Sequence, residues 1–227
     1  MAGVAIVAVC TGFGRAAEQY KLHSFKKAQL SDQFFSEGAH FGDFNHDGVM
    51  DVVSGPYWYA GPKFTERHEY YAAEPFDVHA YSKNFFAFTH DVNGDDWTDI
   101  IVLGFPGEES WWFANPEPDD KGKEGHWARH TIMPVTDNES PTLTDVTGDG
   151  RPEVVCSTGG QLGYAEIPKD DPTKLWKFTP ISPKRDYQRF THGLGVGDVN
   201  NDGKMDILVK EGWWEQPATW RSKNISS

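Results

Sequence analysis

The fold is decided by a nine-residue stretch that first occurs as DFNHDGVMD at residues 43–51. Three relatives follow it: DVNGDDWTD at 91–99, DVTGDGRPE at 145–153 and DVNNDGKMD at 198–206. We call these stretches loop 1 to loop 4, in chain order. Their first residues lie 48, 54 and 53 positions apart. An internal period of this size is typical of propellers and solenoids.

The residues around each loop repeat as well. An apolar, β-type run such as Ile100-Ile101-Val102 follows directly, and then a Gly-containing turn and an aromatic stretch such as Trp111-Trp112-Phe113. One further alternating stretch follows, and the residues before each loop supply another strand. Four strands per repeat predict an all-β protein, a β-propeller made of four-stranded antiparallel blades.

The repeats place about four blades in residues 36–227, and residues 20–30 resemble the fourth strand of a blade. Two explanations remain open. The chain forms a compact four-bladed ring, or it is the N-terminal part of a larger propeller. A seven-bladed ring at this period needs about 360 residues. We favour the second explanation and expect further C-terminal blades or domains.

Composition limits the class of partner. The 227 residues include 34 acidic and 21 basic side chains, for a formal net charge of −13. Phosphate binding needs a basic face, so nucleic acid is not expected as a main partner. Aromatic residues make up 14% of the chain, which is too many for a disordered or collagen-like protein.

The N-terminus favours export. Residues 2–9, AGVAIVAV, form an apolar run that is too short to span a bilayer. Gly14, Ala16 and Ala17 are small residues at a spacing that suits signal-peptidase cleavage, so residues 1–16 are predicted to be a signal peptide. The alternative is a buried N-terminal strand. Export implies a secreted, periplasmic or cell-surface protein without a transmembrane span, and cleavage leaves Cys156 without a disulfide partner.

The loops are predicted to bind Ca²⁺, which takes about six to eight oxygen ligands. Side chains at positions one, three, five and nine converge in a tight loop, and position seven offers its backbone carbonyl. Glycine at position six allows the sharp turn in loops 1, 3 and 4, whereas loop 2 has Asp96 there. The predicted ligands are Asp43, Asn45, Asp47, Val49 and Asp51; Asp91, Asn93, Asp95, Trp97 and Asp99; Asp145, Thr147, Asp149, Arg151 and Glu153; and Asp198, Asn200, Asp202, Lys204 and Asp206.

Two other interpretations of the loops are less favoured. An EF-hand needs a bidentate Glu at position twelve and flanking helices, and neither is indicated. A single Asp/Asn/Gly loop is more simply a turn, but four in register favour metal. The ligand positions hold 12 of the 34 carboxylates, so four Ca²⁺ ions would cancel eight of the thirteen excess negative charges. This predicts a structural role for Ca²⁺.

The four loops resemble the FG-GAP/VCBS repeats of integrin-like β-propellers, over about residues 36–227. A narrower resemblance rests on FGDFN at 41–45, SGPYWY at 54–59 and HGLGVGDVN at 192–200. These stretches look like the propeller domain of aldos-2-ulose dehydratase-like proteins, which dehydrate a dicarbonyl sugar. That resemblance implies a propeller pocket holding a metal ion such as Zn²⁺ beside the structural metals.

A second site is suggested by His40, His90 and His192, each just before or within the predicted innermost strand of a blade. Glu139 occupies the matching stretch of the third blade. Innermost strands line the channel of a propeller, so these four side chains are candidate Zn²⁺ ligands, with His90 and His192 as candidate catalytic residues. The alternative is that they are ordinary channel or surface histidines bonded to backbone groups.

Three functions remain open at this point. The first is a non-catalytic module that binds carbohydrate or protein. The second is a metal-dependent sugar dehydratase or lyase that uses the histidines. The third is an adhesion module like the integrin propeller.

Overall fold

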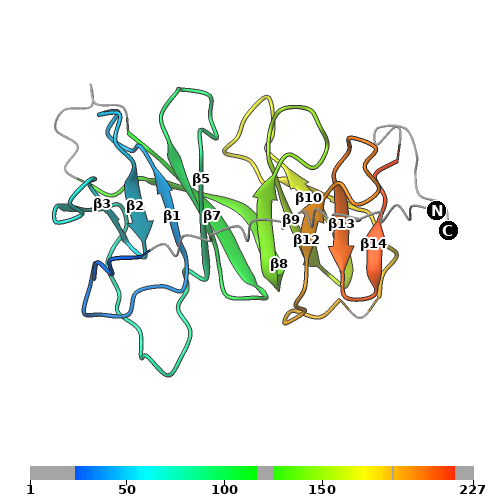
Figure 1. The fold of residues 1–227 in the computed structure, drawn as a ribbon, viewed down its shortest axis with the longest axis horizontal. Coiled ribbons are helices and arrows are strands. Elements are labelled where there is room, and N and C mark those ends of the chain that lie inside the picture. The colour runs from blue at the N-terminus through cyan, green and yellow to red at the C-terminus, as the bar shows by residue number, and fades with distance from the viewer. Residues whose placement is uncertain (1–23, 117–124, 186, 218–227) are drawn as a thin grey trace, which may run out of the picture.

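A computed structural model describes residues 24–116, 125–185 and 187–217. Figure 1 shows an all-β protein in which successive groups of strands follow one another along the long axis, from the blue β1–β3 at one end to the red β13 and β14 at the other. All pairings between named strands are antiparallel, which confirms the all-β prediction. Among the described residues, no helix is long and apolar enough to cross a membrane.

The strands form three sheets in which neighbours in sequence are neighbours in space. The first sheet has the order β1-β2-β3-β4, the second β11-β10-β9-β8-β7-β6-β5 and the third β12-β13-β14. The strands are β1 (Ala39–Gly42), β2 (Asp51–Ser54), β3 (Tyr57–Tyr59), β4 (Arg67–Glu69), β5 (Phe86–His90), β6 (Asp99–Leu103), β7 (Glu108–Ala114), β8 (Ala128–Thr144), β9 (Glu153–Thr158), β10 (Gln161–Glu166), β11 (Lys177–Pro180), β12 (Gly195–Gly197), β13 (Asp206–Val209) and β14 (Gly212–Trp214).

The seven-stranded sheet contains two repeats that share one long strand. The first part of β8 pairs with β7, from Ala128 opposite Ala114 to Thr136 opposite Glu108. Its second part pairs with β9, from Asp137 to Thr144. The register shifts between Asp137 and Thr142, next to Asn138, which has a φ of 88°. The sequence predicts two separate strands here, but the chain between them stays paired and bends through this irregularity.

Four repeats can therefore be defined. Repeat 1 is β1–β4, repeat 2 is β5–β7 with the first part of β8, repeat 3 is the second part of β8 with β9–β11, and repeat 4 is β12–β14. The fourth strand that the repeat pattern predicts for repeat 4, at Trp220 and the residues after it, lies outside the described residues. So do the predicted signal peptide and residues 20–23. Residues 24–30 belong to no strand.

Three hydrophobic clusters lie between successive repeats, because the central strands alternate faces. Ile100 and Val102 of β6 pack with repeat 1, whereas Ile101 and Leu103 pack with repeat 3. β9 does the same in its turn: Val154 and Cys156 belong to the cluster with repeat 2, and Val155 to the cluster with repeat 4. Repeats 2 and 3 thus bury both faces of their central strands, β6 and β9, against their neighbours.

Cys156 offers a probe of this packing. Its side chain is fully buried in β9, and burial raises the pKa of its thiol. A thiol must be both exposed and ionised to react. In a Cys10→Ser background, we expect iodoacetamide to label Cys156 only at the rate at which the protein unfolds. Mass spectrometry of samples quenched in native buffer and in guanidinium chloride measures this. Rapid labelling in native buffer would contradict the packing described here.

Candidate metal sites in the aspartate-rich loops

The four loops share one conformation, which the aspartate at position one organises. In loop 1, Oδ1 of Asp43 accepts the N–H of Asp47 at 3.2 Å, and Oδ2 accepts the N–H of Gly48 at 2.9 Å. The same two bonds, to the residues at positions five and six, recur in the other loops at 2.8–3.2 Å. The carboxylate at position five in turn accepts the N–H of position seven in every loop. This hydrogen-bond pattern repeats four times.

Two positions in each loop have a left-handed backbone. Position six was expected to do so, and it has φ values of 81°, 68°, 87° and 84° in loops 1 to 4. Position four does so as well, with His46, Gly94, Gly148 and Asn201 at φ values between 56° and 78°. The sequence analysis did not identify position four. The signal was present, since glycine or asparagine stands there in three loops, and these residues tolerate positive φ best.

The acid at position nine lies behind the loop rather than on its rim. Asp51, Asp99 and Asp206 have no exposed surface. One oxygen of each accepts the N–H of position two, at 2.8–3.0 Å. The other oxygen accepts the N–H of a residue one or two positions after the third strand of the repeat, at 2.8–2.9 Å. We call this pair of bonds the position-nine clamp. A carboxylate oxygen has two lone pairs, so the prediction that these oxygens also bind metal stays open.

The residue held by the clamp has a signature in the sequence. Gly61, Asn115 and Gln216 each stand directly before a proline, and Ile167 does so in repeat 3. A residue before proline is biased toward an extended backbone, which directs its N–H to the clamp. The sequence analysis did not identify these residues.

Loop 3 differs from the others, because position nine is a glutamate. Glu153 accepts the N–H of Val146 at 2.9 Å and the N–H and hydroxyl of Thr147 at 3.3 and 3.2 Å. Its longer side chain brings one carboxylate oxygen within 4.8 Å of those of Asp145 and Asp149. No other described set of three or more His, Cys, Asp or Glu side chains meets this criterion. This acidic group could bind a metal ion such as Ca²⁺, which prefers oxygen ligands.

Electrostatics favour a cation at these loops. Burial raises the pKa of Glu153 to about 7, although its bonds to Val146 and Thr147 oppose this. Burial likewise raises the pKa of Asp99 to about 7, against the lowering effect of the N–H groups of Asn115 and Val92. A bound divalent cation would offset the cost of keeping such buried carboxylates ionised. In loop 3, Lys169 supplies part of the compensating positive charge, because its Nζ forms an ion pair with Asp149 at 3.2 Å.

The histidines predicted to bind zinc do not form one cluster. Nε2 of His192 lies 2.8 Å from an Oε atom of Glu139. His40 bonds instead to the hydroxyl of Thr89 at 2.8 Å. Burial lowers the pKa of His90. The structure thus brings one pair of the four side chains, His192 and Glu139, into direct contact, and their role as zinc ligands stays a prediction.

Asp96 lets the left-handed turn be tested. It has a φ of 68° at the position where the other loops carry glycine. We expect Asp96→Gly to raise the free energy of unfolding by about 1 kcal/mol, because glycine adopts this conformation without the penalty of a side chain. Chemical denaturation measures the change. Asp96→Asn removes the same charge but keeps the side chain. An equal gain in this control would mean that charge rather than backbone conformation is responsible.

The clamp can be separated from metal binding by comparing two acids of loop 2. Asp99→Asn places an N–H₂ donor where an acceptor for a backbone N–H is needed. We therefore expect it to lower the free energy of unfolding, measured with a chelator present, by about 1–3 kcal/mol. Asp95→Asn at position five retains the acceptor for the N–H of Trp97, so it should cost well under 1 kcal/mol. Denaturation with a chelator at pH 8 compares them. Equal losses would show that position nine has no special structural role.

One family model matches the chain, that of the FG-GAP-like repeat. It matches residues 91–156 and 145–209, which together include loops 2 to 4 and just over half of the chain. No curated protein matches the chain. The repeated loops, the strands between them and this match agree, and the chain belongs to the FG-GAP-like repeat family.

Proposed function

We propose that this chain is an exported, calcium-stabilised β-propeller segment that acts as a binding module for carbohydrate or protein. The observation that carries the calcium part is the acidic group of Asp145, Asp149 and Glu153, whose carboxylate oxygens lie within 4.8 Å of one another. Every candidate donor in the loop is an oxygen, which suits a hard cation. The other three loops repeat its backbone hydrogen bonds, so we extend the proposal to them.

The propeller part is supported by how the repeats adjoin. Each described repeat is an antiparallel meander, and repeats 2 and 3 each bury their central strand between two neighbours. The first strands of successive repeats lie close together, β1 beside β5 and β8 beside β12. Blades arranged around an axis have these features. Residues 1–16 as a signal peptide and residues 36–227 as four blades complete this proposal, whereas residues 24–30, within the strand predicted at residues 20–30, form no strand.

The binding part is supported by a cavity at these first strands. It has a volume of about 390 Å³, and it combines aromatic walls with a few polar groups, as ligand sites do. Aromatic faces beside carboxylate and imidazole groups suit the apolar faces and hydroxyls of a sugar ring. The lining residues are Glu37, Gly38, Ala39, His40, Phe85, Phe86, Ala87, Phe88, Glu139 and His192.

The same cavity favours a second candidate, a zinc-dependent sugar dehydratase or lyase. His40, Glu139 and His192 line it together, although they come from three different repeats. His90 is not among its lining residues. Zinc held by imidazole and carboxylate would polarise a sugar carbonyl. A neighbouring carboxylate or imidazole of the chain would then accept the proton from the adjacent carbon.

Metal content tests both candidates. After dialysis against metal-free buffer, elemental mass spectrometry should find close to four calcium ions per chain. A calcium chelator should lower the melting temperature, because the clustered carboxylates then repel one another. Added Ca²⁺ should restore it better than Mg²⁺, which prefers fewer and more regularly placed ligands. About one zinc ion per chain in addition would support the dehydratase.

Two variants serve as controls. Asp149→Asn should lower the calcium content by about one ion and leave any zinc in place. Glu139→Gln should remove zinc and leave calcium unchanged. If the protein retains no calcium and the chelator does not change its melting temperature, the calcium proposal is overturned. Calcium without zinc would be consistent with the binding module and would overturn the dehydratase proposal.

A further inference from the structure

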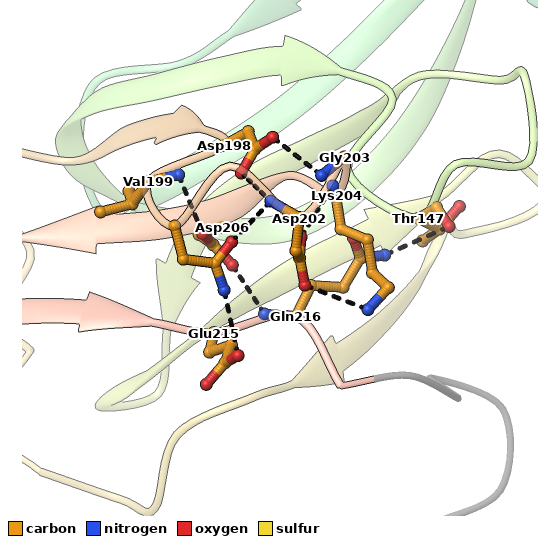
Figure 2. A network of polar contacts seen from close by, with 10 residues as sticks. Thr147, Asp198, Val199, Asp202, Gly203, Lys204, Asp206, Glu215 and Gln216 are labelled. Atoms are coloured by element: carbon orange, nitrogen blue, oxygen red, sulfur yellow. Dashed lines mark hydrogen bonds and ion pairs between the residues drawn. The ribbon is translucent and has the colours of Figure 1, made fainter.

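A hydrogen-bonded connection links loop 4 to loop 3 (Figure 2). Oδ1 of Asp206, at position nine of loop 4, accepts the backbone N–H of Gln216 at 2.9 Å. The side-chain amide of Gln216 donates to the backbone carbonyl of Thr147 at 3.3 Å. Thr147 stands at position three of loop 3, and its N–H and hydroxyl are both bonded to Glu153. One buried side chain therefore connects the acids at position nine of two loops.

Loops 2 and 1 are connected in the same way. Oδ1 of Asp99 accepts the N–H of Asn115 at 2.8 Å, and Nδ2 of Asn115 donates to the carbonyl of Phe44 at 2.9 Å. Phe44 stands at position two of loop 1, and its own N–H is held by Asp51. Asn115 and Gln216 are both buried, with 6% and 5% of their surfaces exposed. The connection thus recurs at the same position of two repeats, although the amide side chain is Asn in one and Gln in the other.

The connection is missing between loops 3 and 2. Ile167 occupies the position of Asn115 and Gln216 before the proline, and it has no side-chain amide. It lies instead in the hydrophobic cluster that includes Val92, at position two of loop 2. The contact between these two loops is therefore apolar and non-directional. The four loops fall into two connected pairs.

We propose that Gln216 and Asn115 are positioning residues that couple calcium binding within two pairs of loops, 3 with 4 and 1 with 2. The inference rests on the proposed binding of calcium. An ion in loop 4 restrains Asp206 and its clamp. The hydrogen bond from Gln216 then restrains Thr147, which is a candidate ligand of loop 3. The second ion then meets a loop that is already partly ordered and loses less conformational entropy. Binding within a pair is cooperative, and the two pairs are independent of each other.

Loops 3 and 4 give the cleaner test. Loops 1 and 2 also touch through His46 and Trp97, whose rings stack at 3.6 Å. Asp202→Asn disables loop 4, while its amide oxygen can still accept the N–H of Lys204. Calcium binding to loop 3 is read from the amide resonance of Gly150, whose N–H bonds to Asp145 at 2.8 Å. A titration with Ca²⁺ in ¹H–¹⁵N spectra of the full chain follows this resonance.

The variant Gln216→Met keeps the length of the side chain and the clamped N–H but removes the amide. With Gln216 present, we expect Asp202→Asn to weaken calcium binding at loop 3 by about fivefold or more. In the Gln216→Met background, we expect the same change to leave loop 3 unaffected. Gln161→Met is the matched control, since Gln161 bonds to the carbonyl of Ser182. It should behave as the parent chain does.

Two further measurements complete the test. Asp149→Asn, which disables loop 3, should leave calcium binding at loop 2 unchanged, read from the amide of Asp96. If Gln216→Met does not fold, Asn115→Leu combined with Asp95→Asn asks the same question of loops 2 and 1, read from Gly48. Calcium shifts at Gly150 that do not depend on loop 4 would overturn the coupling alone. No calcium shift at any loop would overturn the proposed calcium binding and the coupling with it.

Discussion

The rest of the structure depends on the buried acid at position nine. In three repeats its two oxygens hold two backbone N–H groups that lie at opposite ends of the repeat, one in the loop and one after the third strand. Each hydrogen bond to a charged group contributes about 1.5–3 kcal/mol. The acid thereby fixes the loop against the sheet. A turn held only by its own side chains would not be fixed in orientation relative to the sheet.

The packing between repeats uses the orientation that this clamp provides. The strand after each loop begins at the acid itself, in β2, β6, β9 and β13, so the clamp also sets which residues of that strand face each neighbour. β-branched residues alternate there, as Ile100 and Ile101 do, and supply two apolar faces. A slip of one residue would exchange the two faces. Polar and apolar parts of the repeat therefore specify the same register.

Much of this could be predicted from the sequence because it is local. The period of the loops and the alternation of the strands require only neighbouring residues, and both gave the all-β repeats. The clamp could not be predicted in this way, because Asp99 meets Asn115 only after a hairpin has closed. The shared strand β8 was missed for a related reason: Thr136 and Asp137 pair with different partners, Glu108 and Ser157. The predicted zinc ligands come from different repeats. The sequence does not show how the strands of one repeat lie relative to those of another, so it could not show whether these side chains meet.

Loop 3 departs from the pattern of the other loops at position nine. An aspartate at position nine is short and stays behind the loop, where backbone N–H groups take both oxygens. Glu153 is one methylene longer, reaches the other acids, and bonds within its own loop. Its repeat also has Ile167 in place of an amide before the proline, so apolar packing replaces the connection to the preceding loop. Both departures lie in one repeat: Glu153 keeps the bond to the N–H of position two, and the apolar contact of Ile167 stands where Asn115 and Gln216 make an amide connection.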